Sequence, residues 1–297
     1  MARRGTLSWT LGLILLAGVS PLLAQTAFSV RSDGDDNRDD YLYSIDLATG
    51  EATPIGPTGF EDVESLAFDR NCETLFAVDD VTDRLLTCDI TTGDCTQVGN
   101  LGVDIIDTGL AFADDLSLFM STDAPKNPTR FFKVSRFTGV ATPVGNQGQE
   151  VTGLAAGPAG IFGLGGDGRD NLVRIDPETG AATPVGNLGT VSPRDGGLDF
   201  TADGVLWGIE DAGFRDPSRI FTVDLETGAA TVVATVHLEN GTELGGFEGL
   251  AIEDGVCATL AGQATVLEVP TLGEWGLALL TALLTGAGLF LLRRTPG

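Results

Sequence analysis

The middle of the chain repeats itself five times, and this repetition limits the folds it can adopt. A short apolar element recurs as SLAF, GLAF, GLAA, GLDF and GLAI, with its leucine at positions 66, 110, 154, 198 and 250. A second element recurs out of phase with the first, as IDLATGEATPIG, CDITTGDCTQVG, VSRFTGVATPVG, IDPETGAATPVG and VDLETGAATVVA. Successive leucines are 44 residues apart three times and then 52. Units of about 40–45 residues are typical of the blades of a β-propeller.

Each unit has the pattern of four short strands separated by Gly, Asp and Asn turns. In the second unit the predicted strands are Ser65–Phe68, Leu75–Val78, Arg84–Cys88 and Cys95–Val98. Between the third and fourth strands, an Asp or Ser side chain can accept backbone hydrogen bonds, and a Gly then adopts a positive φ. These turn pairs are Asp46 and Gly50, Asp89 and Gly93, Ser135 and Gly139, Asp176 and Gly180, and Asp224 and Gly228.

The first unit lacks a first strand, and the chain has an unmatched first strand at the end. The segment Ala27–Val30 reads as a second strand, whereas Phe247–Ile252 reads as a first strand with no unit after it. If the two share one blade, the ring closes and leaves no open edge. We therefore predict an all-β fold, a five-bladed β-propeller of four-stranded blades that is closed by both chain ends. An open solenoid or a sandwich is the alternative, but a solenoid needs no split unit.

The first 24 residues have the arrangement of a secretory signal peptide. Arg3 and Arg4 precede an apolar run that starts at Leu11, and Ala24 is a small residue suited to cleavage. An uncleaved anchor is the alternative. We predict export across the inner membrane, a propeller domain at residues 25–262 and a linker at residues 263–268.

The C-terminal segment predicts one transmembrane helix. From Trp275 to Leu292 no residue is charged, which is near the lower length limit for a membrane span. The basic pair Arg293 and Arg294 would remain on the cytoplasmic side, so the domain would lie outside the membrane. A buried helix of a soluble protein is the alternative.

The same tail carries a specific order of motifs. Val269, Pro270, Thr271 and Leu272 precede Trp275 and Gly276, and the apolar helix then leads to Arg293 and Arg294. This order resembles the IPTL-CTERM sorting signal of Gram-negative bacteria, with Val269 in place of the Ile. The resemblance implies that residues 269–297 are an address recognised and cut by a membrane exosortase. The processed protein would then reach the cell surface or be secreted.

The four cysteines of an exported chain favour disulfides. When the hairpins are aligned, Cys88 takes the place of Ile45, Val134, Ile175 and Val223, and Cys95 the place of Ala52, Ala141, Ala182 and Ala230. These two positions would face each other across one hairpin, so we predict a Cys88–Cys95 disulfide. Cys72 and Cys257 could pair only by elimination, and that pairing stays open.

The net charge of −25 argues against nucleic acid as a partner, because the chain would repel phosphates. In a propeller, the loops from the second to the third strand share one face, and four of the five carry at least two carboxylates. The sequence therefore predicts a negatively charged rim. The loops are residues 33–40, 79–83, 122–128, 165–171 and 210–218.

One of these loops suggests Ca²⁺ binding, since hard cations prefer several oxygen ligands. Asp33, Asp35, Asn37 and Asp39 alternate as at the start of an EF-hand loop. Arg38 and Ser44 depart from that pattern, because an EF-hand has Gly and Glu there. A solvated acidic loop explains the same residues. The sequence points to no cofactor other than this hypothetical Ca²⁺.

Catalytic motifs are weak. His237 is the only histidine, and no GxSxG element accompanies it. Among so many acids, no carboxylate pair can be singled out for glycoside hydrolysis. The sequence favours a non-catalytic surface module that binds an extracellular polymer or protein. The alternative is an extracellular hydrolase of glycosides or phosphoesters that uses rim carboxylates, with or without Ca²⁺.

Overall fold

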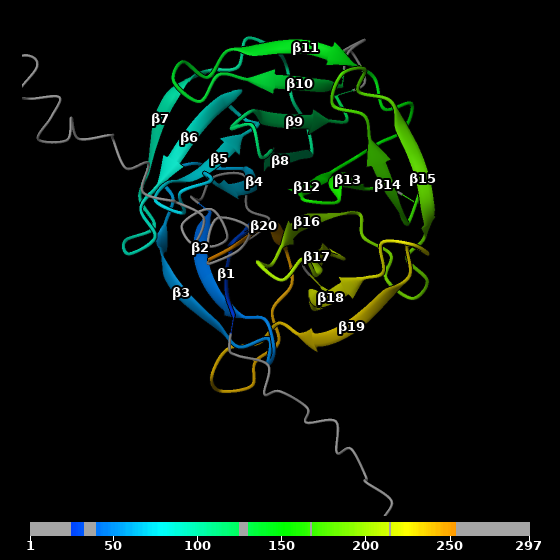
Figure 1. Ribbon diagram of the computed structural model, residues 1–297. Helices are drawn as coiled ribbons and strands as arrows, with labels where there is room; N and C mark the ends of the chain where they lie inside the picture. Colours follow the sequence, from blue (N-terminus) through cyan, green and yellow to red (C-terminus); the bar gives the residue numbers. More distant parts are fainter. Residues whose placement is uncertain (1–24, 33–39, 125–129, 167, 214, 254–297) are drawn as a thin grey trace, which may run out of the picture.

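The computed structural model describes residues 25–32, 40–124, 130–166, 168–213 and 215–253. In these residues the chain forms twenty strands in five four-stranded antiparallel sheets, arranged around an axis as the blades of a propeller (Figure 1). The predicted fold class is therefore confirmed for the repeat region. The predicted transmembrane helix and the predicted domain boundaries at 24, 262 and 268 lie outside the described residues.

The strands follow one another from the axis outward in each blade. Blade 1 contains β20 (Phe247–Ile252), β1 (Thr26–Arg31), β2 (Tyr41–Asp46) and β3 (Ala52–Pro57). Blades 2 and 3 contain β4 (Val63–Phe68), β5 (Leu75–Asp79), β6 (Arg84–Cys88) and β7 (Cys95–Asn100), then β8 (Thr108–Phe112), β9 (Leu118–Thr122), β10 (Phe131–Val134) and β11 (Ala141–Gly145). Blades 4 and 5 contain β12 (Gly153–Gly157), β13 (Gly160–Leu164), β14 (Asn171–Ile175) and β15 (Ala182–Asn187), then β16 (Asp195–Phe200), β17 (Leu206–Asp211), β18 (Arg219–Val223) and β19 (Ala230–Thr235).

The ring closes in blade 1, as the split unit predicts. β20 pairs antiparallel with β1, with Ala27 opposite Ile252 and Arg31 opposite Phe247. The hydroxyl of Ser29 adds a bond to the carbonyl of Gly249 at 2.7 Å. A strand from the end of the repeat region thus completes the sheet that the start of this region begins.

The hydrophobic core consists of five clusters, each located between two consecutive blades. The repeat leucines Leu66, Leu110, Leu154, Leu198 and Leu250 contribute one buried side chain to each cluster. Burying one such side chain is worth about 1.5–3 kcal/mol. The cluster that contains Ala27, Ile45, Ile209 and Ile220 lies between blades 5 and 1. Ring closure therefore also buries this last of the five clusters.

The hairpin turns behave as predicted and also bind neighbouring blades together. In blade 5, for example, Asp224 accepts the N–H groups of Glu226 and Thr227, and Gly228 has a φ of 74°. The glycine that ends the second repeat element lies against the hairpin turn of the next blade. A Cβ on Gly186 of blade 4 would lie 1.8 Å from the carbonyl oxygen of Thr227, so only Gly lets the turn of the next blade approach.

The predicted disulfide is present. Cys88 and Cys95 lie opposite each other on β6 and β7 and are joined by a disulfide. The four other blades pair Ile or Val with Ala at these positions. Cys72 is also disulfide-bonded, whereas Cys257 lies outside the described residues.

We expect the Cys88→Ser/Cys95→Ser variant to lose about 2–3 kcal/mol of unfolding free energy, because the unfolded chain loses a constraint. The variant Cys88→Val/Cys95→Ala is the matched control, since it has the apolar pair found in blades 3 and 5. It should recover about 1 kcal/mol of that loss by restoring buried apolar contact. Denaturant unfolding of both variants and of the wild type measures the differences. Equal stability of all three proteins would show that the disulfide contributes nothing.

Candidate functional site

The starts of three innermost strands bring three carboxylates together at one end of the central channel. Glu64 lies on β4, Asp195 begins β16, and Glu248 lies on β20. One carboxylate oxygen from each residue lies within 4.8 Å of the others, and the residues are only 3%, 6% and 8% exposed. We call these three residues the carboxylate cluster. Three of the five blades therefore contribute one buried acid each to the same point.

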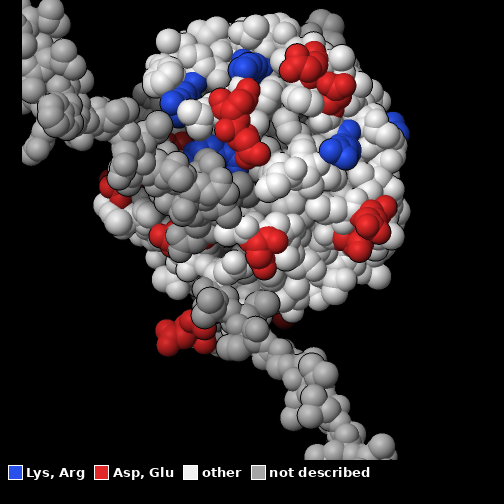
Figure 2. Space-filling view, viewed as in Figure 1, with Lys and Arg blue, Asp and Glu red and all other residues white. Residues whose placement is uncertain are grey.

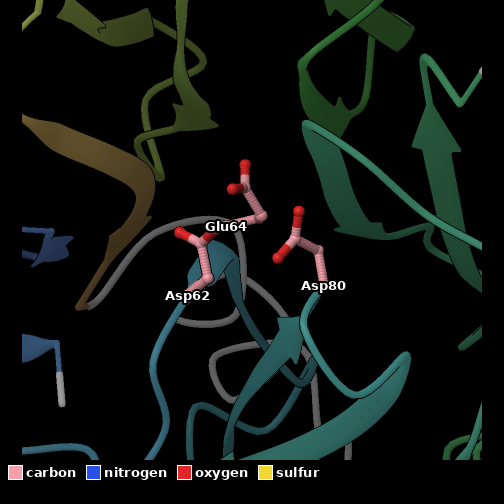
Figure 3. Close-up of side chains that lie close together, drawn as sticks. All are labelled: Asp62, Glu64 and Asp80. Carbon is pink, nitrogen blue, oxygen red and sulfur yellow. The ribbon is translucent and has the colours of Figure 1, made fainter. Parts of the chain in front are cut away.

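Two further acids extend the carboxylate cluster toward the surface. Figure 3 shows the carboxylates of Asp62, Glu64 and Asp80 directed toward a common space. Their oxygens also lie within 4.8 Å of one another. Asp62 stands one residue before β4, and Asp80 one residue after β5, so both belong to loops on the same side of blade 2. We call this end of the channel the acidic mouth.

Burial raises the pKa of every member of the carboxylate cluster well above its ordinary value. Neighbouring acids raise these pKa values further: Glu248 acts on Glu64, Asp107 on Asp195, and Asp195 on Glu248. Burial, with Asp62 as the strongest neighbour, raises the pKa of Asp80 to about 8. The acidic mouth therefore retains protons at pH values where isolated carboxyl groups have lost them.

Many other acids at this end have structural roles, since they accept hydrogen bonds from backbone N–H groups. Asp40 accepts from Val63 at 2.8 Å, Asp79 from Thr82 at 2.9 Å, and Asp83 from Ile105 at 2.9 Å. In contrast, the Oε2 atoms of Glu64 and Glu248 are buried and have no hydrogen-bond partner among the described residues. These two oxygens accept no hydrogen bond from the backbone of the loops, so the positions of the two side chains need another explanation.

Solvent reaches the carboxylate cluster through an open cavity of about 600 Å³. Asp195 and Glu248 line it together with Asp107, Asp211 and Arg194. Burial raises the pKa of Asp211, and Arg194 opposes this rise. Small ions and water can therefore reach the buried acids from the outside.

Arg70 occupies the opposite end of the channel. Its Nε donates to the carbonyl of Ala113 at 3.1 Å and its Nη2 to the carbonyl of Ala156 at 3.2 Å, and it forms an ion pair with Asp114 at 2.9 Å. Burial raises the pKa of nearby Asp199 to about 6. Only a space of about 20 Å³ remains beside these groups. The channel is therefore open to solutes at the acidic mouth and packed at the other end.

Charged side chains are sparse on the face that Figure 2 shows. There, acidic and basic side chains lie in small scattered groups on a mostly uncharged surface. A larger open groove of about 850 Å³ lies between blades 3 and 4 and combines Lys133 and Arg174 with Asp115 and Glu178. Because the acids of this groove do not converge on one point, the acidic mouth is the stronger candidate site.

The residues predicted as a calcium loop, Asp33, Asp35, Asn37 and Asp39, lie outside the described residues. The acids of the carboxylate cluster come from the starts of first strands rather than from the loops between second and third strands, where the sequence predicts the acidic rim. A signal for them was available in the repeat. Two residues before the repeat leucine, Glu64 and Glu248 stand where the other units have Thr108, Thr152 and Gly196.

His237 takes part in ring closure. Its backbone N–H donates to Gly50 at 2.9 Å, and its carbonyl accepts the N–H of Ala52 at 2.7 Å. Its ring nitrogens lie 2.9 Å from the carbonyl oxygen of Leu238 and 3.2 Å from that of Thr49. The imidazole is thus placed among backbone carbonyls between blades 5 and 1, and not at the acidic mouth.

The comparison with protein families concerns the tail. Residues 269–294 match the family model described as IPTL-CTERM motif. The chain carries an IPTL-CTERM motif. The motif implies an exported, C-terminally anchored protein that an exosortase processes, as the resemblance of Val269, Pro270, Thr271 and Leu272 predicts. Across the described residues, no helix is both long and apolar enough to span a membrane.

A comparison with curated proteins gives no match. Among solved structures, TolB from Acinetobacter baumannii is similar at 14% identity and a TM-score of 0.48, over 77% of this chain and 66% of the TolB chain. A chain of a nidogen/laminin complex is similar at 13% identity and a TM-score of 0.48, over 77% of this chain and 98% of that one. Nothing about a ligand of this chain follows from either likeness.

The raised pKa values at the acidic mouth predict that the protein without divalent ions becomes less stable as the pH rises. A carboxyl whose pKa is higher in the folded state makes folded protein bind more protons than unfolded protein. The free energy of unfolding therefore falls from the ordinary carboxyl pKa up to the raised one. We expect the melting temperature in EDTA to fall between about pH 5 and about pH 8, the value to which the pKa of Asp80 is raised.

The variant Asp80→Asn should remove the upper part of this fall, whereas Asp94→Asn, which changes an exposed acid in a hairpin turn, should keep it. Circular dichroism melts from pH 5 to pH 8.5 measure both. A wild-type melting temperature that rises over this range would contradict the prediction.

Proposed function

We propose that this chain is an exosortase-sorted surface protein whose propeller is a non-catalytic module that binds an extracellular polymer or protein. The observation that supports this best is the combination of an IPTL-CTERM motif with a closed, rigid propeller that concentrates acids at one open end. The tail would deliver the domain to the surface, and the acidic mouth would be its contact surface.

The burial of the carboxylate cluster favours binding over catalysis. Its members are at most 8% exposed, and their oxygens lie within 4.8 Å of one another. A sugar ring or a phosphoester between two such groups would need space that the neighbouring carboxylates occupy. A partner would instead contact the loops around the mouth, which carry the acids Asp62 and Asp80. Such a surface favours partners with positive groups or partners bridged by cations.

A second candidate function, an extracellular hydrolase, is favoured by one specific observation. Acids with raised pKa values converge at the mouth, and general acid catalysis needs a carboxyl that is protonated near neutral pH. Asp80 would be the most accessible group of this kind. The two functions differ in a simple way, since a hydrolase changes its polymer and a binding module leaves it intact.

Sorting can be tested in a Gram-negative host that carries an exosortase. We expect the wild-type chain to reach the cell surface as a shortened product, and the Pro270→Ala/Thr271→Ala variant to remain full-length in the membrane fraction. Thr265→Ala, in the predicted linker before the motif, is the control and should behave as the wild type. Immunoblots of fractionated cells report both properties. Identical processing of all three chains would contradict the assignment of residues 269–272.

Binding can be tested with the extracellular polysaccharide of the producing cells as the probe. We expect the wild-type chain to sediment with the polymer, and the Asp62→Asn/Asp80→Asn variant to do so at least about threefold less. Glu178→Gln/Glu226→Gln, which removes the same charge from exposed hairpin turns, should bind as the wild type. Analysis of the polymer by size after incubation distinguishes the alternatives, because shortened chains would identify a hydrolase.

A further inference from the structure

The carboxylate cluster brings three acidic groups from three blades to one point. Among the described residues, no Lys or Arg forms an ion pair with Glu64, Asp195 or Glu248. Removing an ionised carboxylate from water costs several kcal/mol unless an opposite charge compensates it. Five further acids act on the cluster, namely Asp40, Asp62, Asp80, Asp107 and Asp211, and Arg194 lines the adjoining cavity.

A separate observation points to a missing ligand. The Oε2 atoms of Glu64 and Glu248 are buried and lack hydrogen-bond partners among the described residues, although each residue is more than nine-tenths buried. A buried acceptor without a partner is costly, and such groups are rare in native proteins. The hydroxyl of Thr152 is a third buried oxygen without a partner, and it occupies the same position in its repeat unit as both glutamates.

We propose that Glu64, Asp195 and Glu248 bind a divalent cation at the acidic mouth, and that Ca²⁺ is the ion whose coordination they fit. The site is built from blades 2, 5 and 1, so the ion would join three blades around the axis. This proposal does not depend on surface display or on the partner of the propeller.

The ligand chemistry selects the ion. Ca²⁺ takes 6–8 oxygen ligands at about 2.3–2.6 Å, so oxygens on opposite sides of one ion lie about 5 Å apart. The oxygens of the cluster all lie within 4.8 Å of one another, which agrees with that limit. Mg²⁺ demands near-ideal octahedral geometry, keeps several waters and is usually bound by only one or two carboxylates, so a group of three carboxylates fits Ca²⁺ better. Water from the adjoining cavity of about 600 Å³ would complete the coordination shell.

Shared protons are the competing explanation for the cluster. Asp195 and Glu64 lie close enough for a hydrogen bond between their side chains, which requires that one of them be protonated. Protons and Ca²⁺ would then compete for the same oxygens, because a metal binds the deprotonated carboxylate. Ca²⁺ affinity should therefore increase as the pH rises, and an ion attracted only to the exposed acidic surface would show a much weaker dependence.

The test uses the full-length chain, purified in a mild detergent and freed of metal with EDTA that is then removed. Calorimetric titration with CaCl₂ at pH 7.5 should show one site, and Ca²⁺ should raise the melting temperature. The Glu64→Gln/Glu248→Gln variant should lose at least about tenfold in affinity together with the melting shift. Glu178→Gln/Glu226→Gln, which carries the same change of charge on exposed turns, should retain both.

Folding of the variant is checked in the same measurement. Without Ca²⁺ at pH 7.5, Glu64→Gln/Glu248→Gln should melt at or above the wild-type temperature, since two buried carboxyls have been neutralised. Asp35→Asn/Asp39→Asn examines the other candidate loop. The proposal is wrong if the wild type gives no heat at millimolar Ca²⁺, if Glu64→Gln/Glu248→Gln binds like the wild type, or if only Asp35→Asn/Asp39→Asn loses binding.

Discussion

The pairing of β1 with β20 is the contact on which the rest of the molecule depends. It adds the innermost strand to blade 1, and it buries the apolar cluster between blades 5 and 1. It also sets Glu248 on the axis beside Glu64 and Asp195, which belong to other blades. Without this pairing the protein would have an open sheet edge and an exposed core layer, and the carboxylate cluster would not exist. Folding and the candidate site therefore require the same long-range contact.

The buried charged groups at the two ends of the channel differ in how they are compensated. At the packed end, Arg70 neutralises nearby acids and also donates to the carbonyls of Ala113 and Ala156, so charge and hydrogen bonds are balanced within the protein. At the acidic mouth, burial and repulsion act on the carboxylate cluster together, and no Lys or Arg among the described residues forms an ion pair with it. Since evenly distributed acids would keep the protein soluble at less cost, this concentration of buried acids is the feature on which the proposed binding role depends.

The repeat made most of the fold predictable. The split unit predicts the pairing of Ala27–Val30 with Phe247–Ile252, and hairpin alignment predicts that Cys88 faces Cys95, because both follow from local periodicity. The contact between Gly186 and the next blade was not predicted, since it depends on how closely two blades approach. The carboxylate cluster was missed for a related reason. Its members are single acids among 42, and only the three-dimensional ring brings positions 64, 195 and 248 together.

Ring closure also brings the first and the last described strands of the ring to the same end of the channel. The N–H of Glu253 donates to the carbonyl of Thr26 at 2.9 Å, so the strand that enters blade 1 and the strand that leaves it meet at one end. This is the end at which the carboxylate of Asp199 accepts the N–H of Ile252 near Arg70, whereas Glu248 stands at the other end of the same strand. The chain therefore leaves the propeller at the packed end of the channel, and any attachment through this exit leaves the entrance to the carboxylate cluster on the far side.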